Sequence, residues 1–371
     1  MYNQKKTGLR TGGHRIRVGG TEEKPKKHLG GIIMLVVLVV LTFYMLLRNL
    51  ELRELWRVIC SANPLYLGIG FAAVLLFLAG EGQCYRVMLK GLGEHIRFWP
   101  SFTYGCVDFY VSAITPSATG GQPAVVYAMS KDGVPVAKAG MVLLLYTVVY
   151  KAVLMTLGII SVCVHPELIF GGEWYFKLLF AFGVTVNVVV MAVFWLAMFS
   201  NTLMLRVCRS LVVLGHKLHL VRHPEDKLAS LEEQLAEYRA SAAYIRQNPA
   251  MPFRVYLWAM AQRLCMFSVS FWVYRSLGYS GLSIGYFIVI QVMISIAVDS
   301  LPLPGGVGAA EKMFLVLYGT IYTAGHQLEP ALLLTRGLNY YGCLILCSII
   351  CIVHQQRVMH RQKPVAPPTA S

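Results

Sequence analysis

The strongest constraint on this fold is a run of prolines and glycines that lies between two stretches apolar enough to enter a membrane. Residues 301–311 read Leu-Pro-Leu-Pro-Gly-Gly-Val-Gly-Ala-Ala-Glu, and Asp299 stands just before them. Proline lacks the amide proton of a helix and its ring clashes with the preceding turn, and lipid offers no water to satisfy the backbone groups that such a break frees. We therefore expect this segment to be enclosed by protein or to line a wet cavity.

The composition around this break indicates a membrane protein. Hydrophobic residues make up 56% of the 371 residues and charged residues only 14%, which is too apolar for an ordinary soluble protein of this length. The formal charge of +15 does not indicate nucleic-acid binding, because lysine and arginine collect in the segments between apolar runs. That distribution is typical of cytoplasmic loops and tails.

The apolar runs predict an all-α polytopic membrane protein with about six full spans. Residues 1–28 are basic and predict a disordered cytoplasmic tail, 29–355 a transmembrane domain, and 356–371 a second cytoplasmic tail. Inside the domain, residues 48–60 predict a short amphipathic helix on the outer surface, and 200–250 a cytoplasmic segment with an amphipathic helix. The predicted full spans are 29–47, 64–85, 139–164, 174–199, 252–274 and 331–353.

A second break, Thr115-Pro-Ser-Ala-Thr-Gly-Gly-Gln-Pro123, divides another short apolar segment. Its flanks are basic, so we predict a re-entrant helical hairpin that enters from the inside and turns at this break. The first break then belongs to a hairpin that enters from the outside.

The two hairpins are predicted to be related as inverted repeats. Pro64 and Pro252 are 188 residues apart, and so are Pro116 and Pro304. In many transporters the broken elements of such repeats meet near the midplane of the bilayer and form the substrate site.

The two breaks resemble the signature segments of the lysylphosphatidylglycerol synthase transmembrane-region family. The first segment is Thr115-Pro-Ser-Ala-Thr-Gly-Gly-Gln-Pro-Ala-Val-Val-Tyr127 with Lys131-Asp-Gly133, and the second is Leu303-Pro-Gly-Gly-Val-Gly-Ala-Ala-Glu311. The resemblance spans residues 30–355. It implies the flippase-like membrane half of multiple-peptide-resistance-type proteins, with a link to lipid metabolism and antibiotic resistance.

In full-length synthases of that family, a soluble domain moves lysine from lysyl-tRNA to phosphatidylglycerol and the membrane part translocates the product. Only a short basic segment follows the last predicted span, so we expect the synthase domain to be absent. Some members carry an acid after the first glycine pair, where this chain has Gln122. Glu311 is then the one acid within either break.

The candidate substrate path consists of the two breaks and two cations in spans. Glycine allows positive φ and a close approach of backbone to a ligand, although a purely structural hairpin tip would use the same residues. The path residues are Thr115, Pro116, Gly120, Gly121, Gln122, Pro123, Lys151, Pro304, Gly305, Gly306, Gly308, Glu311 and Arg336.

Charged residues within spans are costly and need partners. Glu311 either caps the following half-helix or contacts substrate or a proton, and both roles are compatible. Lys151 lies near the middle of a span, with Glu311, Asp108, Glu81 or a lipid phosphate as the partners to choose from. Asp108, Arg263 and Asp299 are weaker candidates.

No catalytic residue, cofactor or metal site is expected. Ser117 and Thr119 have no histidine nearby, and the nine cysteines are scattered without a C-x-x-C pair. We expect a lipid translocase of the bacterial inner membrane, with both termini cytoplasmic, that moves an anionic or aminoacylated phospholipid such as lysylphosphatidylglycerol, or a polyprenyl phosphate.

Two alternatives remain open at this point. A phosphatidylglycerol lysyltransferase, which the resemblance invites, would make lysyl-lipid and engage a transfer RNA; otherwise no nucleic acid is expected as a partner. An accessory scaffold of an envelope glycosyltransferase would tolerate Glu311→Gln but not loss of the helix in residues 200–250. Whether the chain forms a homo-oligomer is left open.

Overall fold

The computed structural model describes residues 52–115, 120–172, 174–200, 224–301, 303, 306–322 and 327–361. The predicted tail at 1–28 and the predicted span at 29–47 lie outside these residues and stay predictions. The elements of the described part are helices: α2 (Leu52–Ser61), α3 (Pro64–Gly91), α4 (Phe98–Ile114), α5 (Gly121–Lys131), α6 (Val136–Val164), α7 (Glu167–Phe170), α8 (Trp174–Phe199), α10 (Pro224–Gln247), α11 (Ala250–Ser276), α12 (Ile284–Val298), α13 (Ala309–Tyr318), α14 (Leu328–Arg336), the π-helix η4 (Gly337–Gly342) and α15 (Cys343–Arg361).

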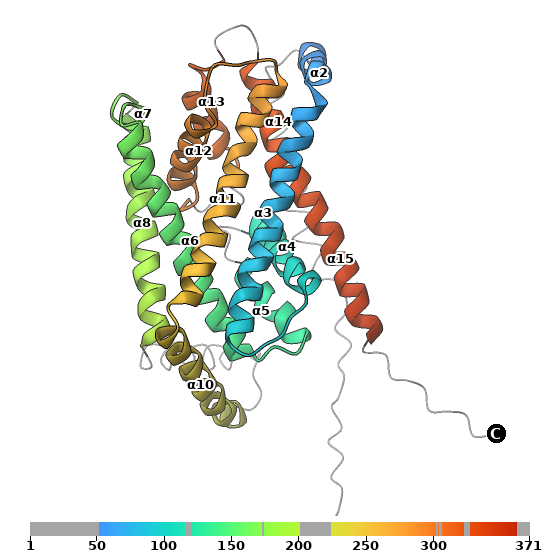
Figure 1. The fold of residues 1–371 in the computed structure, drawn as a ribbon, viewed down its shortest axis with the longest axis vertical. Coiled ribbons are helices and arrows are strands. Elements are labelled where there is room, and N and C mark those ends of the chain that lie inside the picture. Colours follow the sequence, from blue (N-terminus) through green and yellow to red (C-terminus); the bar gives the residue numbers. More distant parts are fainter. Residues whose placement is uncertain are drawn as a thin grey trace, which may run out of the picture.

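Two short helical hairpins enter the bundle from opposite ends, as predicted. Figure 1 shows α4 and α5 in the lower half of the bundle and α12 and α13 in the upper half, each pair turning back near the middle. The first turn contains Thr115 and the second contains Gly306. The helices α3, α6, α8 and α11 run the whole height of the bundle around them.

Helix contacts follow the inverted-repeat relation. The first helices of the two repeats, α3 and α11, pack on each other more extensively than any other pair of described elements. The inner hairpin helix α4 packs on α15, the last helix of the second repeat, and its counterpart α12 packs on α6, the last helix of the first. The prediction of an all-α polytopic membrane protein is thus confirmed, and these contacts agree with the predicted inverted repeats.

Helix starts follow the local sequence. Asn63 accepts a hydrogen bond from the Leu65 amide at 2.9 Å, and Pro64 occupies the first turn of α3, where its missing amide proton costs nothing. Ser283 caps α12 in the same way, accepting from the Tyr286 amide at 3.3 Å. These caps fix where α3, in the first repeat, and α12, in the second, begin.

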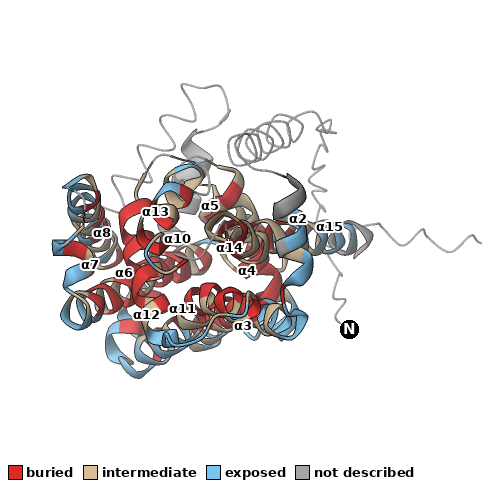
Figure 2. Ribbon diagram, turned by 90° about the horizontal axis from the view of Figure 1, so that it is seen from above, coloured by how far each residue is buried: buried red, intermediate tan, exposed pale blue. Residues whose placement is uncertain are grey.

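The outer surface of the bundle is apolar. Four helices of the described part are long and apolar enough to cross a membrane: Pro64–Gly91, Val136–Val164, Trp174–Phe199 and Leu328–His354. The exposed residues of α8 include Leu178, Phe182, Val189, Trp195 and Leu196. Figure 2 shows buried residues gathered at the centre and exposed ones at the rim. A wide exposed apolar belt is what lipid contact requires.

The helix α11 is as long as these spans but more polar. It carries Arg254, Arg263 and Arg275, and it buries Gln262 and Ser270. Because it packs between α3, α6 and α12, its buried polar residues meet other protein groups rather than lipid. Burial against other helices therefore explains how Gln262 and Ser270 are accommodated in a helix that has the length of a span.

The last predicted span is not one continuous α-helix. It consists of α14, a π-helical segment at Gly337–Gly342, and α15, which continues to Arg361 and so into the predicted tail. Tyr340 in the π-helix donates a hydrogen bond to the Ala113 carbonyl oxygen at 3.2 Å, at the end of α4. Such π-helical turns occur frequently at functional sites.

A close approach of α8 and α12 gives a testable packing prediction. A Cβ atom at Gly183 would collide with the backbone carbonyl oxygen of Ile296. We expect Gly183→Ala to lower the free energy of unfolding by about 1–3 kcal/mol, since neither backbone can yield. Thermal unfolding in detergent measures this. Gly140→Ala in α6 is the control, because nothing lies within 4 Å of its added Cβ and alanine favours helix. Equal stability of both variants would contradict the predicted clash.

Candidate functional site

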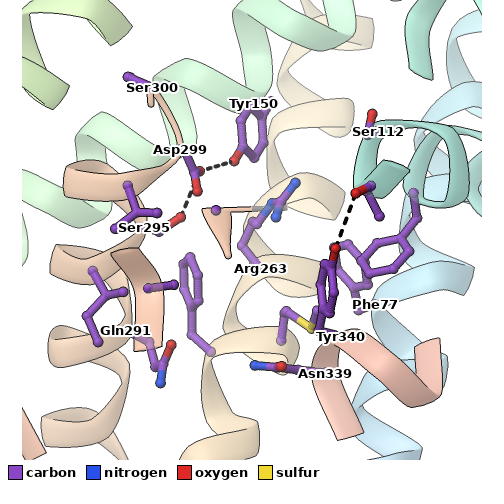
Figure 3. Close-up of a pocket in the computed structure, with 18 of the residues that line it drawn as sticks. Phe77, Ser112, Tyr150, Arg263, Gln291, Ser295, Asp299, Ser300, Asn339 and Tyr340 are labelled. Atoms are coloured by element: carbon purple, nitrogen blue, oxygen red, sulfur yellow. Dashed lines mark hydrogen bonds between the residues drawn. The ribbon is translucent and has the colours of Figure 1, made fainter. Parts of the chain in front are cut away.

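A cavity of about 740 Å³ lies between the two hairpins. Both hairpins contribute to its wall, with Ser112 and Gln122 from the first and Asp299 and Gly306 from the second. Figure 3 shows Arg263 between these walls, with Asp299 on one side and Phe77 on the other. The cavity therefore lies where the inverted-repeat prediction placed a substrate site.

The tip of the inner hairpin is closed by its own threonine. The Thr115 hydroxyl donates to the Val111 carbonyl oxygen at 2.8 Å and accepts from the Gly120 amide at 3.1 Å. A Cβ at Gly121 would collide with Asp108 and Ser112, so only glycine lets α5 start this close to α4. The glycines of this tip are thus needed to bring the two arms together.

The other predicted residues of the inner tip take different positions. Gln122 lines the cavity, and its amide donates to the Thr147 hydroxyl on α6. Pro123 is exposed and does not line the cavity. Pro116, Pro304 and Gly305 lie outside the described residues.

In the outer hairpin, Glu311 caps the half-helix α13 and pairs with Arg336. Its carboxylate accepts from the Gly308 amide, and Gly308 has φ of +86°. A second carboxylate oxygen lies 2.8 Å from Nε of Arg336, with side-chain exposures of 5% and 13%. Glu311 therefore ties α13 to α14 and does not itself line the cavity, while Gly306 and Arg336 do.

Two cations line the cavity without an ion pair among the described residues. Lys151 on α6 has its Nζ 5.1 Å from the centroid of the Tyr150 ring. Arg263 on α11 has its guanidinium carbon 4.1 Å from the Tyr150 centroid and 5.1 Å from the Phe77 centroid. The ion pairs of the described residues are formed by other cations, and Nε of Arg263 is buried without a hydrogen-bond acceptor.

Asp299 stands opposite these cations at the end of α12. Its carboxylate accepts from the Tyr150 hydroxyl at 2.8 Å and from the Ser295 hydroxyl at 2.8 Å, as the dashed lines in Figure 3 show. It forms no ion pair with Lys151 within the described residues, although both line the cavity. Among the partners predicted for Lys151, Glu311 is instead occupied by Arg336.

A pair of carboxyl groups lies on the other side of Arg263. Glu81 on α3 is 4% exposed, and a Cβ at Gly105, one helical turn before Asp108 on α4, would lie 3.4 Å from the Cβ of Glu81. Asp108 accepts from the Tyr85 hydroxyl at 2.9 Å and from the Ser112 hydroxyl at 3.2 Å. Both carboxyl groups line the cavity.

Several cavity residues were weak candidates or none in the sequence. Arg263 is one of three arginines on α11, and only the structure shows that it is the one facing the cavity. Asn339 and Tyr340 reach the cavity because η4 departs from α-helical geometry. In the sequence, the one indication of this departure was the pair of glycines that flank them, Gly337 and Gly342. In the described part of the chain no group of three or more metal-ligating side chains is found.

Comparison with known proteins gives a family and a distant relative. The model of the family described as "Lysylphosphatidylglycerol synthase TM region" matches residues 31–347. A "UPF0104 membrane protein" from Archaeoglobus fulgidus is 23% identical over 290 residues, which cover 78% of this chain and 85% of that protein. The family match includes the two hairpins and the cavity between them.

Proposed function

We infer, from the premise that this chain belongs to the lysylphosphatidylglycerol synthase transmembrane-region family, that it is a lipid translocase. In this proposal the headgroup of an anionic lipid enters the cavity between the hairpins while its acyl chains stay in the bilayer. The charge distribution of the loops and tails favours cytoplasmic termini. In this proposal the membrane is a bacterial inner membrane.

The observation that carries the proposal is the pair of cations, Lys151 and Arg263, in the cavity. A charge within a span costs several kcal/mol unless something compensates it. Neither cation has a carboxylate partner in an ion pair among the described residues. An arginine fork and a lysine are the side chains that bind phosphate best, the first through paired hydrogen bonds and the second as a point charge.

The geometry also suits a headgroup that must pass from one side to the other. Residues of both hairpins line the same cavity, although the hairpins enter from opposite ends of the bundle. Arg263 lies near aromatic rings of α3 and α6, which attract its guanidinium, and its Nε has no acceptor among the described residues. A phosphate at this point is within reach of both repeats.

Reconstitution tests the proposal. Purified protein in liposomes is expected to accelerate the movement of fluorescent phosphatidylglycerol and of a polyprenyl phosphate more than that of phosphatidylcholine, because only the first two carry a net negative headgroup for the two cations. Loss of fluorescence on adding an impermeant quencher measures the movement. Protein-free vesicles are the baseline, and rates equal to it for every anionic or aminoacylated lipid tried would reject the proposal.

The lysyltransferase alternative has a separate readout. Lipid extracts of expressing cells, compared by mass spectrometry with cells carrying an empty vector, would contain a new lysyl-lipid if the chain were the transferase. We expect no such species, because the charged groups described in the cavity suit phosphate binding.

A further inference from the structure

The carboxyl pair Glu81–Asp108 suggests how lipid movement is driven. Burial and a neighbouring carboxylate both disfavour the ionised form of a carboxyl group, so two carboxyl groups that lie together inside a protein without a paired cation hold a proton. Glu81 and Asp108 both line the cavity where α3 and α4 approach closely, and neither belongs to an ion pair among the described residues. The pair is therefore a proton site within the lipid path of the proposed function.

Arg263 is the cation that faces this pair among the described residues. The titratable or charged groups around the pair are Cys84 and Tyr85 from α3, Cys106 from α4, Tyr146 and Tyr150 from α6, and Arg263 from α11, while α5 presents the backbone of Gly121. The tyrosines and cysteines are neutral, so the charge balance of this side of the cavity is set by the pair and by Arg263.

The position of Arg263 leaves it free to serve either of two partners. Its guanidinium carbon lies over the rings of Tyr150 and Phe77, and Nε has no acceptor among the described residues. With the shared proton in place the carboxyl pair carries a charge of −1, and without it −2. The second negative charge would draw Arg263 toward the carboxylates and would repel a phosphate.

We propose that the Glu81–Asp108 pair binds a proton together with the headgroup phosphate held by Arg263, so that proton and lipid cross the membrane in the same direction. Loss of the proton draws Arg263 to the carboxylates and releases the headgroup, and proton binding frees Arg263 to hold it. The coupling is reciprocal, as linkage demands: each ligand favours binding of the other. This inference rests on the proposed function and names the ion that drives it.

A pH gradient across reconstituted vesicles tests the coupling. Fluorescent phosphatidylglycerol is expected to move about threefold faster or more when the leaflet it leaves faces the acidic side than with the gradient reversed. One pH unit is worth about 1.4 kcal/mol for one coupled proton, which sets an upper limit of about tenfold. For each protein the rate under one gradient direction is divided by the rate under the other. A variant with a lower basal rate can therefore still be compared with the wild type.

Three variants make the test specific. Glu81→Gln is expected to bring the ratio to about one, because an amide cannot take up the proton, while Glu81→Asp keeps a carboxyl group and a ratio above one. Glu167→Gln, at an exposed acid of α7, is the control and should keep the wild-type ratio. A Glu81→Gln ratio equal to that of the wild type would overturn the inference.

Failure of the two proposals can be told apart. Wild-type protein that moves lipid equally under both gradient directions overturns the proton coupling and leaves the translocase proposal standing. Wild-type protein that moves no anionic lipid overturns both.

Discussion

The Arg263→Gln variant is expected to move anionic lipid about 10- to 100-fold more slowly than the wild type. Hydrogen bonds to a charged group contribute about 1.5–3 kcal/mol, and each 1.4 kcal/mol is a factor of about ten. Nε of Arg263 is a buried donor without an acceptor among the described residues, so its loss removes a contact to phosphate that no neighbour replaces. Initial rates of quencher-accessible phosphatidylglycerol in matched proteoliposomes measure the effect.

Its control lies on the same helix. Arg254→Gln removes an exposed arginine of α11 that does not line the cavity, and it should leave the rate within about twofold of the wild type, because exposed sites rarely contribute more than about 0.5 kcal/mol. Unfolding temperatures of both variants establish that the protein is intact. A folded Arg263→Gln protein that moves lipid at the wild-type rate would contradict the proposed function, which depends on Arg263.

The largest effect on stability is expected at Arg336. Arg336→Met should lower the free energy of unfolding by about 3–5 kcal/mol, since it leaves the Glu311 carboxylate buried without its counter-charge. Chemical unfolding of the detergent-solubilised protein measures the loss. The result would show that this ion pair holds α13 against α14.

The double variant Glu311→Gln/Arg336→Met separates ion-pair loss from packing loss. The double variant is expected to regain most of the stability that Arg336→Met loses relative to the wild type, because no charge is left buried. The glutamine side chain still accepts a hydrogen bond from the Gly308 amide. Lys177→Met, at an exposed residue of α8, is the control for removal of a surface cation and should change little. A double variant as unstable as Arg336→Met would show that the charge of Glu311 is not the cause.

Much of the architecture could be predicted because it depends on local chemistry. The short apolar arm before the second break forms α4 over Phe98–Ile114, since the proline and glycine residues that follow end the helix whatever it packs against. The inverted pairing was predicted from hydropathy and from the spacing of Pro64 and Pro252, and the extensive contact of α3 with α11 agrees with it. The positions of the breaks and of the spans are determined by residues that are neighbours in the sequence, so they can be predicted from it.

The pairing of charges could not be predicted, because it depends on residues far apart in the chain. Glu311 on α13 pairs with Arg336 on α14, in a separate helix. Glu81 lies near Asp108 because a close contact joins α3 and α4, where a Cβ at Gly82 would lie 2.7 Å from the Cα of Phe102. Lys151 had four possible partners in the sequence, and no local pattern could choose among them. The roles assigned to the path residues stay predictions.

The π-helix between α14 and α15 sets the rotational phase of the last helix. One extra residue in a turn rotates everything after it by about 100° relative to a continuous α-helix. Cys343 and Cys347 are fully buried, and they share a hydrophobic cluster with Cys106 and Phe102 of α4. Without the added residue this small-residue stripe would face about a quarter-turn away from α4. The wide turn at Gly337–Gly342 is therefore the element that aims one repeat's final helix at the other repeat's hairpin.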